Sequence, residues 1–556
     1  MRHLRRLGHC LAAGALAGAV VAPLQLLLWP ELTLRWPTAL LALGLWASWA
    51  ALWFGAVSFA LVEVYALLAP QVALRRGFSL GLWSPLAAAH GTVVAAVAFY
   101  NRDRTYQLLG AESREGLRTI GLALLLFTLL VAVLGVARPR QRYARLWAAG
   151  TSLALVATAW GVWATAPRAG AGAALPNELR FSTSRRLLLV SLEGTDLPWL
   201  LPAIERGDMP FLRTLRDEWA WGQLTTVSPF SRLAALTTLA TGCAPATHGV
   251  TGRRAYRIPW LADAPVSLLL KGPWPTPHHL PWRLWQRAAS PAPRRATIWE
   301  ILLRAGRTVG LAGWPGVPAA TWVLPTPLAA EALPYSQVDA ELREALEPSL
   351  RARPEVAERT RNALAVSVQM AALTALRAAR EPVDCLVFNT DLAARLRPLW
   401  RETDADPLGG TEVLRTTARL LDEQLRELWL LAGGDDCLLV VVSPYGMAPP
   451  KPWRRLLNAT LRRRSWTVSP SDSSEGFVLL AGGGVRRHVR LRNARLSDVV
   501  PTVLYLLELP VARDMAGRVA LDAVDEEFAS RIPLRLIPSH PPLHPPHPAG
   551  RQELPE

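Results

Sequence analysis

Several polar side chains that could do chemistry lie next to short apolar runs. Glu193 lies at the end of the run RRLLLVSLEG, and Asp391 follows VDCLVFNT, with Arg395 four residues later. Ser231 and Arg232 precede the apolar run that leads into LATG. Carboxylates bind divalent metals, whereas arginine donates to phosphate or carboxylate oxygens. What these residues can do therefore depends on whether the fold brings them together.

The elements that must position these residues are short apolar strands that alternate with helical stretches. Runs without polar alternation predict strands buried on both faces, which is typical of a mostly parallel sheet covered by helices. In such sheets, ligands bind at the carboxyl ends of the strands. The predicted fold class of this part of the chain is α/β, with strand candidates at 185–194, 307–316, 383–390, 436–443 and 476–485.

The composition predicts a second, membrane-embedded part. Hydrophobic residues make up 51% of the 556 residues, charged residues only 19%, and 23 tryptophans are present, which is too apolar for a soluble protein of this size. The net charge of +17 comes almost entirely from arginine. These arginines are spread along the chain rather than interleaved with aromatic residues, so nucleic acid is not an expected partner. The four cysteines show no CxxC spacing and indicate neither zinc nor disulfides.

Residues 1–168 contain five stretches that are apolar and long enough to cross a bilayer as helices, which takes about 20 residues. Arginine clusters before the first stretch, after the second and between the fourth and fifth predict a cytoplasmic N-terminus. An odd number of spans then places the rest of the chain outside the cytoplasm. We expect a linker at 169–184, one α/β domain at 185–531 and a disordered Pro- and His-rich tail at 532–556. The predicted spans are about 8–28, 38–68, 80–99, 117–137 and 144–166.

Four landmarks along residues 185–525 recur in an order that resembles a known family, the type I phosphodiesterase and nucleotide pyrophosphatase branch of the alkaline phosphatase superfamily. They are Glu193-Gly194 after the first strand, LATGCAPATHGV (239–250), TIWEILLRAGRTVGLAGWPG (297–316) and SDVVPTVLYLLELPVARDMAGRV (497–519). The resemblance implies an alkaline-phosphatase-like fold. It also implies two divalent cations, held by carboxylate and histidine ligands, that clamp an in-line phosphoryl displacement beside a Thr or Ser nucleophile.

Most of the site positions that the resemblance implies are changed in this sequence. Glu193 replaces an Asp, and Arg232 stands at the nucleophile position, nine residues before Thr241 of the TG pair. Asp391 is unchanged, but Arg395 replaces the His of an Asp-x-x-x-His pattern. The Asp-His pair expected after strand 436–443 is Pro444-Tyr445, and the last His aligns with Asp472.

From these changes we predict a cluster in which Arg232 and Arg395 neutralise Glu193 and Asp391 in place of the two metal ions. Unpaired carboxylates that converge without a metal would be costly to bury. This interpretation expects no cofactor and a non-catalytic, membrane-anchored protein of the cell envelope. Its expected partners are the lipid bilayer and an unknown protein or an anionic ligand.

Two other functions remain open. One is a divergent phosphoesterase or phosphotransferase that acts on envelope phosphodiesters. It would hold a single Zn or Mn ion on Glu193, Asp391 and Asp472, with Ser231 as nucleophile, although a Ser before a helix is more often an N-cap. The other is a transporter or assembly factor in which the membrane spans do the work.

Overall fold

The structure, a computed structural model, describes most of the chain, and its contacts divide the chain into two units. The helical unit comprises Met1–Ala173, Thr251–Pro291 and His547–Glu556, and the α/β unit comprises Ala174–Val250 and Ala292–Pro546. The residues described are 2–29, 36–68, 80–137, 141–166, 181–252, 255–258, 262–266, 270–272, 286–288, 292–316, 319–327, 334–400, 410–449, 452, 468–470, 475–540 and 542–543.

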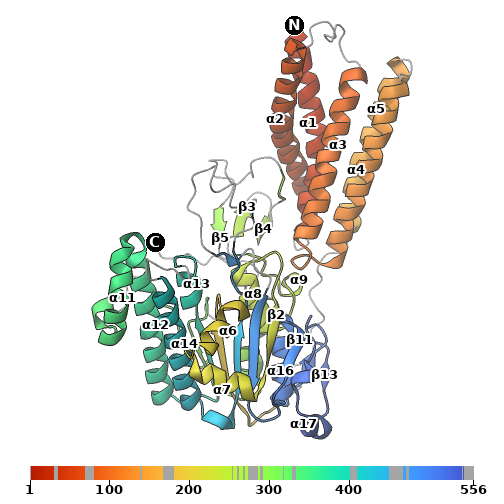
Figure 1. Ribbon diagram of the computed structural model, residues 1–556. Coiled ribbons are helices and arrows are strands. Elements are labelled where there is room, and N and C mark those ends of the chain that lie inside the picture. The colour runs from red at the N-terminus through yellow and green to blue at the C-terminus, as the bar shows by residue number, and fades with distance from the viewer. Residues whose placement is uncertain are drawn as a thin grey trace. The chain divides into compact units, whose positions relative to one another are not determined.

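Five long helices of alternating direction form the helical unit (Figure 1). α1 packs closely on α2 because small residues let the two backbones approach. A Cβ placed on Gly18 would lie 2.5 Å from the Cα of Ala47, and one on Gly14 would lie 2.8 Å from the carbonyl oxygen of Ala50. The helices are α1 (Arg2–Leu27), α2 (Trp36–Leu68), α3 (Leu80–Arg104), α4 (Ala111–Ala137) and α5 (Gln141–Thr165).

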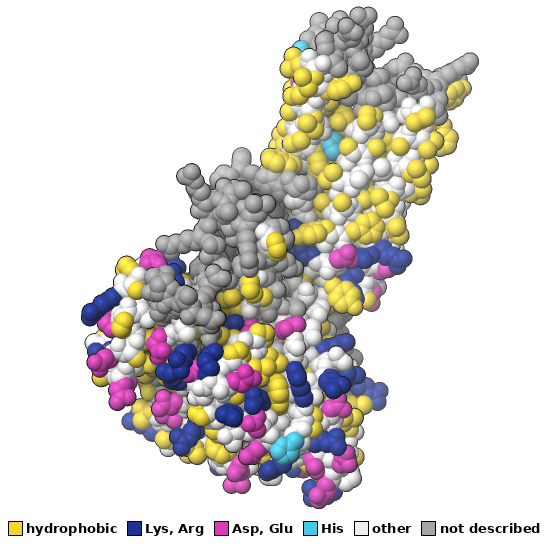
Figure 2. Space-filling model, in the orientation of Figure 1, with side chains coloured by type: hydrophobic (Ala, Val, Ile, Leu, Met, Phe, Trp, Pro, Cys, Tyr) yellow, Lys and Arg dark blue, Asp and Glu magenta, His cyan; other side chains and the backbone are white. Residues whose placement is uncertain are grey.

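Four of these five helices are long and apolar enough to cross a membrane, judged by length and composition. The prediction expected five, and α3 is the exception among the described helices. The sequence of α3 ends on the polar run Asn101 to Arg104. In Figure 2 the surface of the helices carries mainly hydrophobic side chains, whereas charged side chains of both signs cover the α/β unit.

A segment from the middle of the predicted outer domain belongs by its contacts to the helical unit. Two buried amides at helix ends hold its backbone: Gln25 accepts from the N–H of Leu270 at 2.8 Å, and Asn101 both accepts from and donates to the backbone of Lys271. Leu270 is itself buried among the helices. Nothing in the sequence pattern predicted this grouping. The segment, Thr251–Pro291, also contains a small sheet in the order β4-β3-β5, made of Ala262–Val266, Ala255–Ile258 and Gln286–Ala288.

An eight-stranded sheet forms the centre of the α/β unit, in the order β11-β2-β10-β9-β1-β8-β6-β7. β10 is its antiparallel strand, and the other seven run in one direction. The prediction of a mostly parallel sheet is confirmed. The strands are β1 (Arg186–Leu192), β2 (Ala220–Thr225), β6 (Val309–Ala312), β7 (Trp322–Leu324), β8 (Cys385–Thr390), β9 (Cys437–Ser443), β10 (Glu475–Ala481) and β11 (Arg490–Arg495).

Helices cover both faces of this sheet, which explains the continuous apolar runs of its central strands. Every residue of β8 and β9 is buried. One face packs on α6, α7, α11, α12 and α14 in a single core cluster. The helices of the unit are α6 (Leu197–Glu205), α7 (Pro210–Glu218), α8 (Arg232–Thr241), α9 (Pro245–His248), α10 (Ile298–Arg304), α11 (Ala340–Ala352), α12 (Pro354–Arg380), α13 (Leu392–Leu396), α14 (Gly410–Leu431), α16 (Val499–Leu506) and α17 (Glu526–Arg531).

The predicted disordered tail is in part ordered, which corrects the expectation for its first residues. β13 (Leu536–Ile537) pairs in parallel with β12 (Val511–Ala512). His540 is buried and hydrogen-bonds the carbonyl oxygen of Pro510 at 2.9 Å. Backbone hydrogen bonds and one buried ring hold this short segment in place. The Pro-rich composition alone did not indicate these contacts. Residues 544–556 lie outside the described part of the chain.

Candidate functional site

The carboxyl ends of three neighbouring parallel strands define the site. β1 lies between β9 and β8 in the sheet. Glu193 follows β1, Asp391 follows β8, and Pro444 and Tyr445 follow β9. Arg232 is the first residue of α8, which comes after β2. Because parallel strands end at the same edge of a sheet, their next residues meet there.

Glu193 is the centre of the cluster and has no exposed surface. Arg232 binds its carboxylate with two hydrogen bonds, Nε to Oε2 at 2.6 Å and Nη2 to Oε1 at 2.7 Å. The Tyr445 hydroxyl donates to Oε2 at 2.7 Å, and Asn389 Nδ2 donates to Oε1 at 2.8 Å. A carboxylate has about four lone-pair sites. These four donors therefore satisfy Glu193 completely.

Asp391 joins the two arginines of the cluster. Its Oδ2 accepts from Arg232 Nη2 at 3.3 Å, and its Oδ1 accepts from Arg395 Nε at 2.7 Å. Arg395 lies one helical turn after Asp391, so that pair is a local contact within α13 and its cap. The two carboxylates and two guanidiniums balance in formal charge. The structure thus brings together Glu193, Arg232, Asp391, Arg395 and Tyr445.

The cluster fixes the protonation states of two of its members. Burial alone would lower the pKa of Arg232, but the hydrogen bond and charge of Glu193 raise that pKa above its ordinary value. Burial raises the pKa of Tyr445 well above its usual range, and the charge of Glu193 raises it further. Arg232 is therefore a permanent cation, and Tyr445 is a neutral phenol that donates its proton to Glu193.

The Pro444-Tyr445 dipeptide is packed into the site by neighbouring residues. The carbonyl oxygen of Pro444 accepts from the Thr226 hydroxyl, and the carbonyl oxygen of Tyr445 accepts from the N–H of Gly194 at 3.1 Å. The Tyr445 ring meets the Phe230 ring edge to face, with centroids 4.8 Å apart. These contacts hold the phenol in position against Glu193.

A second buried ion pair supports the turn between β1 and α6. Arg397 donates to both carboxylate oxygens of Asp196, at 3.1 and 3.2 Å, and its guanidinium lies over the Trp199 ring. Asp196 also accepts from the backbone N–H groups of Trp199 and Met447. It therefore caps α6 and ties this turn to the loop after β9.

The remaining predicted residues are placed differently. The Ser231 hydroxyl accepts from the N–H of Ala234 at 3.4 Å and caps α8. This serine thus makes the N-cap contact that was the alternative to a role as nucleophile. Asp472 lies outside the described residues. His248 is fully buried, with the Thr238 hydroxyl against its Nε2 and the N–H of Val250 donating to its Nδ1.

The donors in this cluster do not fit a pair of divalent metal ions. Each of the four oxygens of Glu193 and Asp391 already accepts a hydrogen bond from an arginine. A metal ion would have to displace those guanidiniums, and their charge would repel it. Within the described residues, no group of three or more His, Cys, Asp or Glu side chains is placed to hold a metal ion.

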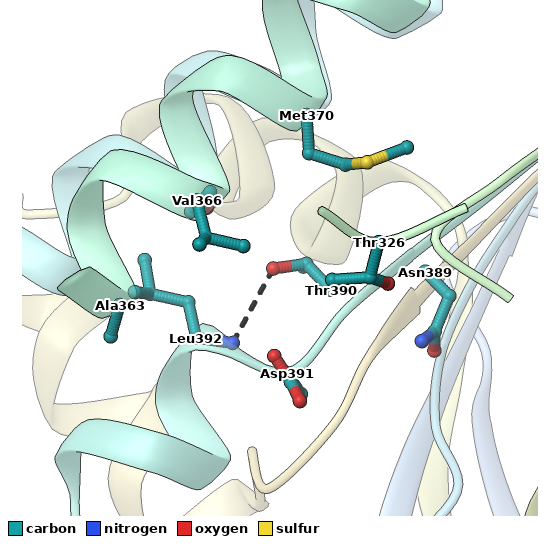
Figure 3. Close-up of a pocket in the computed structure, with 9 residues that line it drawn as sticks. Thr326, Ala363, Val366, Met370, Asn389, Thr390, Asp391 and Leu392 are labelled. Atoms are coloured by element: carbon teal, nitrogen blue, oxygen red, sulfur yellow. Dashed lines mark hydrogen bonds between the residues drawn. The ribbon is translucent and has the colours of Figure 1, made fainter. Parts of the chain in front are cut away.

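Asn389 is the site residue that the sequence analysis missed. Its side chain is 3% exposed, and it donates to Glu193 and to the carbonyl oxygen of Gly313. The available signal was an Asn directly after the apolar run CLVF, because an amide in a buried strand needs hydrogen-bond partners. A small recess lies beside Asn389 and Asp391, below the side chains of Val366 and Met370 on α12 (Figure 3).

The sheet order and the strand-end site define a mostly parallel α/β domain covered by helices, as predicted. The family model described as type I phosphodiesterase / nucleotide pyrophosphatase matches residues 187–503, more than half of the chain, and the chain belongs to this family.

Solved structures with a similar fold come from distant proteins, and the likeness concerns the fold alone. Murine ectonucleotide pyrophosphatase/phosphodiesterase 5 is 14% identical over 59% of this chain and 96% of its own, with a TM-score of 0.37. Phosphonoacetate hydrolase from Sinorhizobium meliloti is 14% identical over 60% and 99%, with a TM-score of 0.33. Alkaline phosphatase PafA is 12% identical over 63% and 100%, with a TM-score of 0.40. A search of curated proteins finds no match.

Proposed function

We propose that this chain is a membrane-anchored, non-catalytic member of its family that binds an anionic ligand or partner in the cell envelope. The observation that carries the proposal is the two-point hydrogen bond of Arg232 to the buried Glu193. Arg232 stands where the family resemblance places the nucleophile. A guanidinium remains protonated at any working pH and has no lone pair with which to attack phosphorus.

The two arginines have donors left for a ligand. Their side chains are 39% and 41% exposed for Arg232 and Arg395. Within the described part of the chain, neither the Nη1 group of Arg232 nor the Nη groups of Arg395 form a hydrogen bond. Guanidinium N–H groups bind phosphate or carboxylate oxygens with good geometry. A phosphate group can therefore bind at this edge of the sheet without being cleaved.

Binding and hydrolysis assays on the full-length protein in detergent test this proposal. Calorimetric titration with ethyl phosphate should show binding, and Arg395→Gln should weaken it at least threefold, because one charged donor is lost. Arg492→Gln, on the exposed edge strand β11, is the matched control and should leave the affinity unchanged.

The competing phosphoesterase function predicts a different result in the same preparation. With Zn or Mn added, the protein would hydrolyse a phosphodiester such as bis(p-nitrophenyl) phosphate, and Ser231→Ala would abolish that turnover. Our proposal expects no turnover above the buffer rate. Metal-dependent hydrolysis that requires Ser231 would overturn it.

We also propose that α3 is a fifth crossing, so that the N-terminus and the α/β unit lie on opposite sides of the membrane. Arg6 near the start of α1 pairs with Glu63 near the end of α2, at 3.2 Å. At the other end of α1, the Gln25 side chain accepts a hydrogen bond from the N–H of Leu270. The Asn101 side chain, at the end of α3, accepts one from the N–H of Lys271. α3 therefore ends opposite the Arg6–Glu63 pair, and the arginine clusters favour the cytoplasm for the N-terminal side.

A further inference from the structure

Arginine is concentrated along the edge strand β11, next to β2 (Figure 1), and along the turn before it. Residues 486–495 carry five arginines and no acidic residue. The first of them, Arg486, pairs with Glu526. Within the described part of the chain, no carboxylate pairs with the other four, which are exposed: Arg487, Arg490, Arg492 and Arg495. Their positive charge is therefore available to a partner.

Two of these arginines stack on tryptophans. The guanidinium carbon of Arg487 lies 4.5 Å from the ring centroid of Trp219, and that of Arg490 lies 5.1 Å from the ring centroid of Trp221. Both tryptophans are half-buried and pack against the core. Charges at a sheet edge discourage pairing with other strands, but that role requires no stacking. The stacks hold two otherwise flexible side chains in place.

Stacking leaves the hydrogen-bond donors of both guanidiniums free. A guanidinium carries its five N–H groups in its plane, so contact through its face uses none of them. Among the residues that the structure describes, the Arg487 and Arg490 side chains donate no hydrogen bond. Each can therefore bind a carboxylate with two hydrogen bonds. Binding also costs less side-chain entropy, because the ring already restricts the arginine.

The two stacks have the spacing of alternate residues in an extended chain. Trp219 and Trp221 are two residues apart in extended backbone, so their side chains lie on one face of the sheet, about 7 Å apart. Arg490 is the register partner of Trp221 on β11. Carboxylates on residues i and i+2 of an extended peptide have the same spacing. A peptide can also hydrogen-bond the backbone of an edge strand, which a lipid or a polysaccharide cannot do in register.

We propose that Arg487 and Arg490 form a docking surface for an extended acidic segment of a partner protein, with carboxylates on alternate residues. The charge of the surface favours such a partner, because residues 216–225 and 486–495 together carry six arginines against Asp217 and Glu218. The surface lies at the amino ends of β2 and β11, whereas the Glu193 cluster lies at the carboxyl ends of the strands. It is thus a second site, independent of the ligand proposed for Arg232.

Two fluorescein-labelled nonapeptides of the same composition test the spacing. Each contains three glutamates and six threonines. The alternating peptide has glutamate at positions 1, 3 and 5, and the spaced peptide has it at positions 1, 4 and 7, so that successive carboxylates fall on opposite faces of a strand. Fluorescence anisotropy with the full-length protein in detergent, at low ionic strength, should show at least fivefold tighter binding of the alternating peptide. Equal affinities, or no binding of either peptide, would overturn the proposal.

Substitution of single arginines locates the bound peptide. Arg487→Gln and Arg490→Gln should each weaken binding of the alternating peptide about tenfold, because charged hydrogen bonds are lost. Arg492→Gln is the matched control. It removes the same charge from the bulge between Leu491 and Ala494, where no described ring stacks on the arginine, and should change the affinity less than twofold.

Two results would contradict the assignment. Equal losses in the three variants would mean that the peptide is held by a diffuse basic surface rather than by the two stacked arginines. Dextran sulfate that binds the wild type when neither peptide does would assign the surface to an anionic polysaccharide instead of a protein segment.

Discussion

Glu193 is fully buried and accepts hydrogen bonds from four donors, two of them from Arg232. Burial of a carboxylate is costly unless it is paired and hydrogen-bonded. Arg232 therefore has a structural role at this edge of the sheet, because it supplies two of the four donors. Arg232 also links Glu193 to Asp391 across this edge of the sheet.

The stability of the α/β unit should depend on this pair. Arg232→Met should lower the free energy of unfolding of the α/β unit by about 3 kcal/mol, because Glu193 is left buried without its counter-charge. Pulse proteolysis of the full chain in urea measures this loss. The double variant Glu193→Met with Arg232→Met should recover much of the stability, because no buried charge then remains.

The more exposed pair offers the control for this experiment. Arg395→Met removes an ion pair whose carboxylate, Asp391, is 18% exposed, whereas Glu193 is 0% exposed, and should cost no more than about 1 kcal/mol. An Arg232→Met variant as stable as Arg395→Met would contradict the role of Arg232 as the essential counter-charge of Glu193.

The buried His248 should make the stability of the α/β unit depend on pH. Burial, followed by the charge of Arg294, lowers its folded-state pKa to about 3 from 6.5. A lowered folded-state pKa gives stability that is full above 6.5 and is lost as pH falls toward 3, because the unfolded chain takes up the proton first. The loss at pH 5 relative to pH 8 should be about 2 kcal/mol.

The variant His248→Gln isolates this contribution. Glutamine can replace the imidazole as acceptor for Val250 and as donor to Thr238, but it does not titrate. Pulse proteolysis at pH 8 and pH 5 should show that the variant lacks about 2 kcal/mol of the wild-type dependence. Parallel pH curves for the two proteins would show that the histidine titrates similarly in both states.

At the scale of elements, continuous apolar runs predicted the central strands well. β1, β6, β8, β9 and β10 all fall on predicted strands, because strands buried on both faces must be apolar throughout. β11 was missed because this edge strand exposes four of its six residues and carries three arginines, Arg490, Arg492 and Arg495. Such charges are typical of sheet edges. The antiparallel direction of β10 depends on its pairing with the neighbouring strands, which no local sequence pattern indicates.

The close contact between α1 and α2 gives a testable prediction about the helices. Gly18→Val should destabilise the helical unit, because a Cβ there would lie 2.5 Å from the Cα of Ala47 and from the carbonyl oxygen of Trp46. We expect the melting temperature in detergent, measured by tryptophan fluorescence, to be several degrees lower than that of the wild type. Gly8→Val, on the same helix with nothing within 4 Å of an added Cβ, is the control. Equal melting temperatures would contradict the close packing.

At the scale of the whole molecule, the site could be anticipated more fully than the make-up of the helical unit. The family pattern placed Glu193, Arg232, Asp391 and Arg395 at strand ends, where they meet. Tyr445 was predicted only as a lost ligand, yet it donates to Glu193, because the direction of a side chain after a strand depends on tertiary packing. The contacts of Leu270 and Lys271 with the helices join residues remote in sequence, so no local signal announced them.

The membrane topology is tested by labelling single cysteines in intact cells. The four native cysteines are buried, so a membrane-impermeant maleimide should react mainly with introduced ones. If α3 crosses, Arg492→Cys on the α/β unit is labelled from outside, and Leu4→Cys at the exposed start of α1 is labelled only after lysis. Labelling of both from the same side would mean an even number of crossings.

The central claim is that an arginine–carboxylate cluster stands where the family resemblance places two metal ions. The most direct test is to incubate the purified full-length protein with zinc or manganese, remove free ions and count the bound metal by elemental mass spectrometry. The account predicts much less than one ion per chain in the wild type. One or two tightly held ions per chain would contradict it.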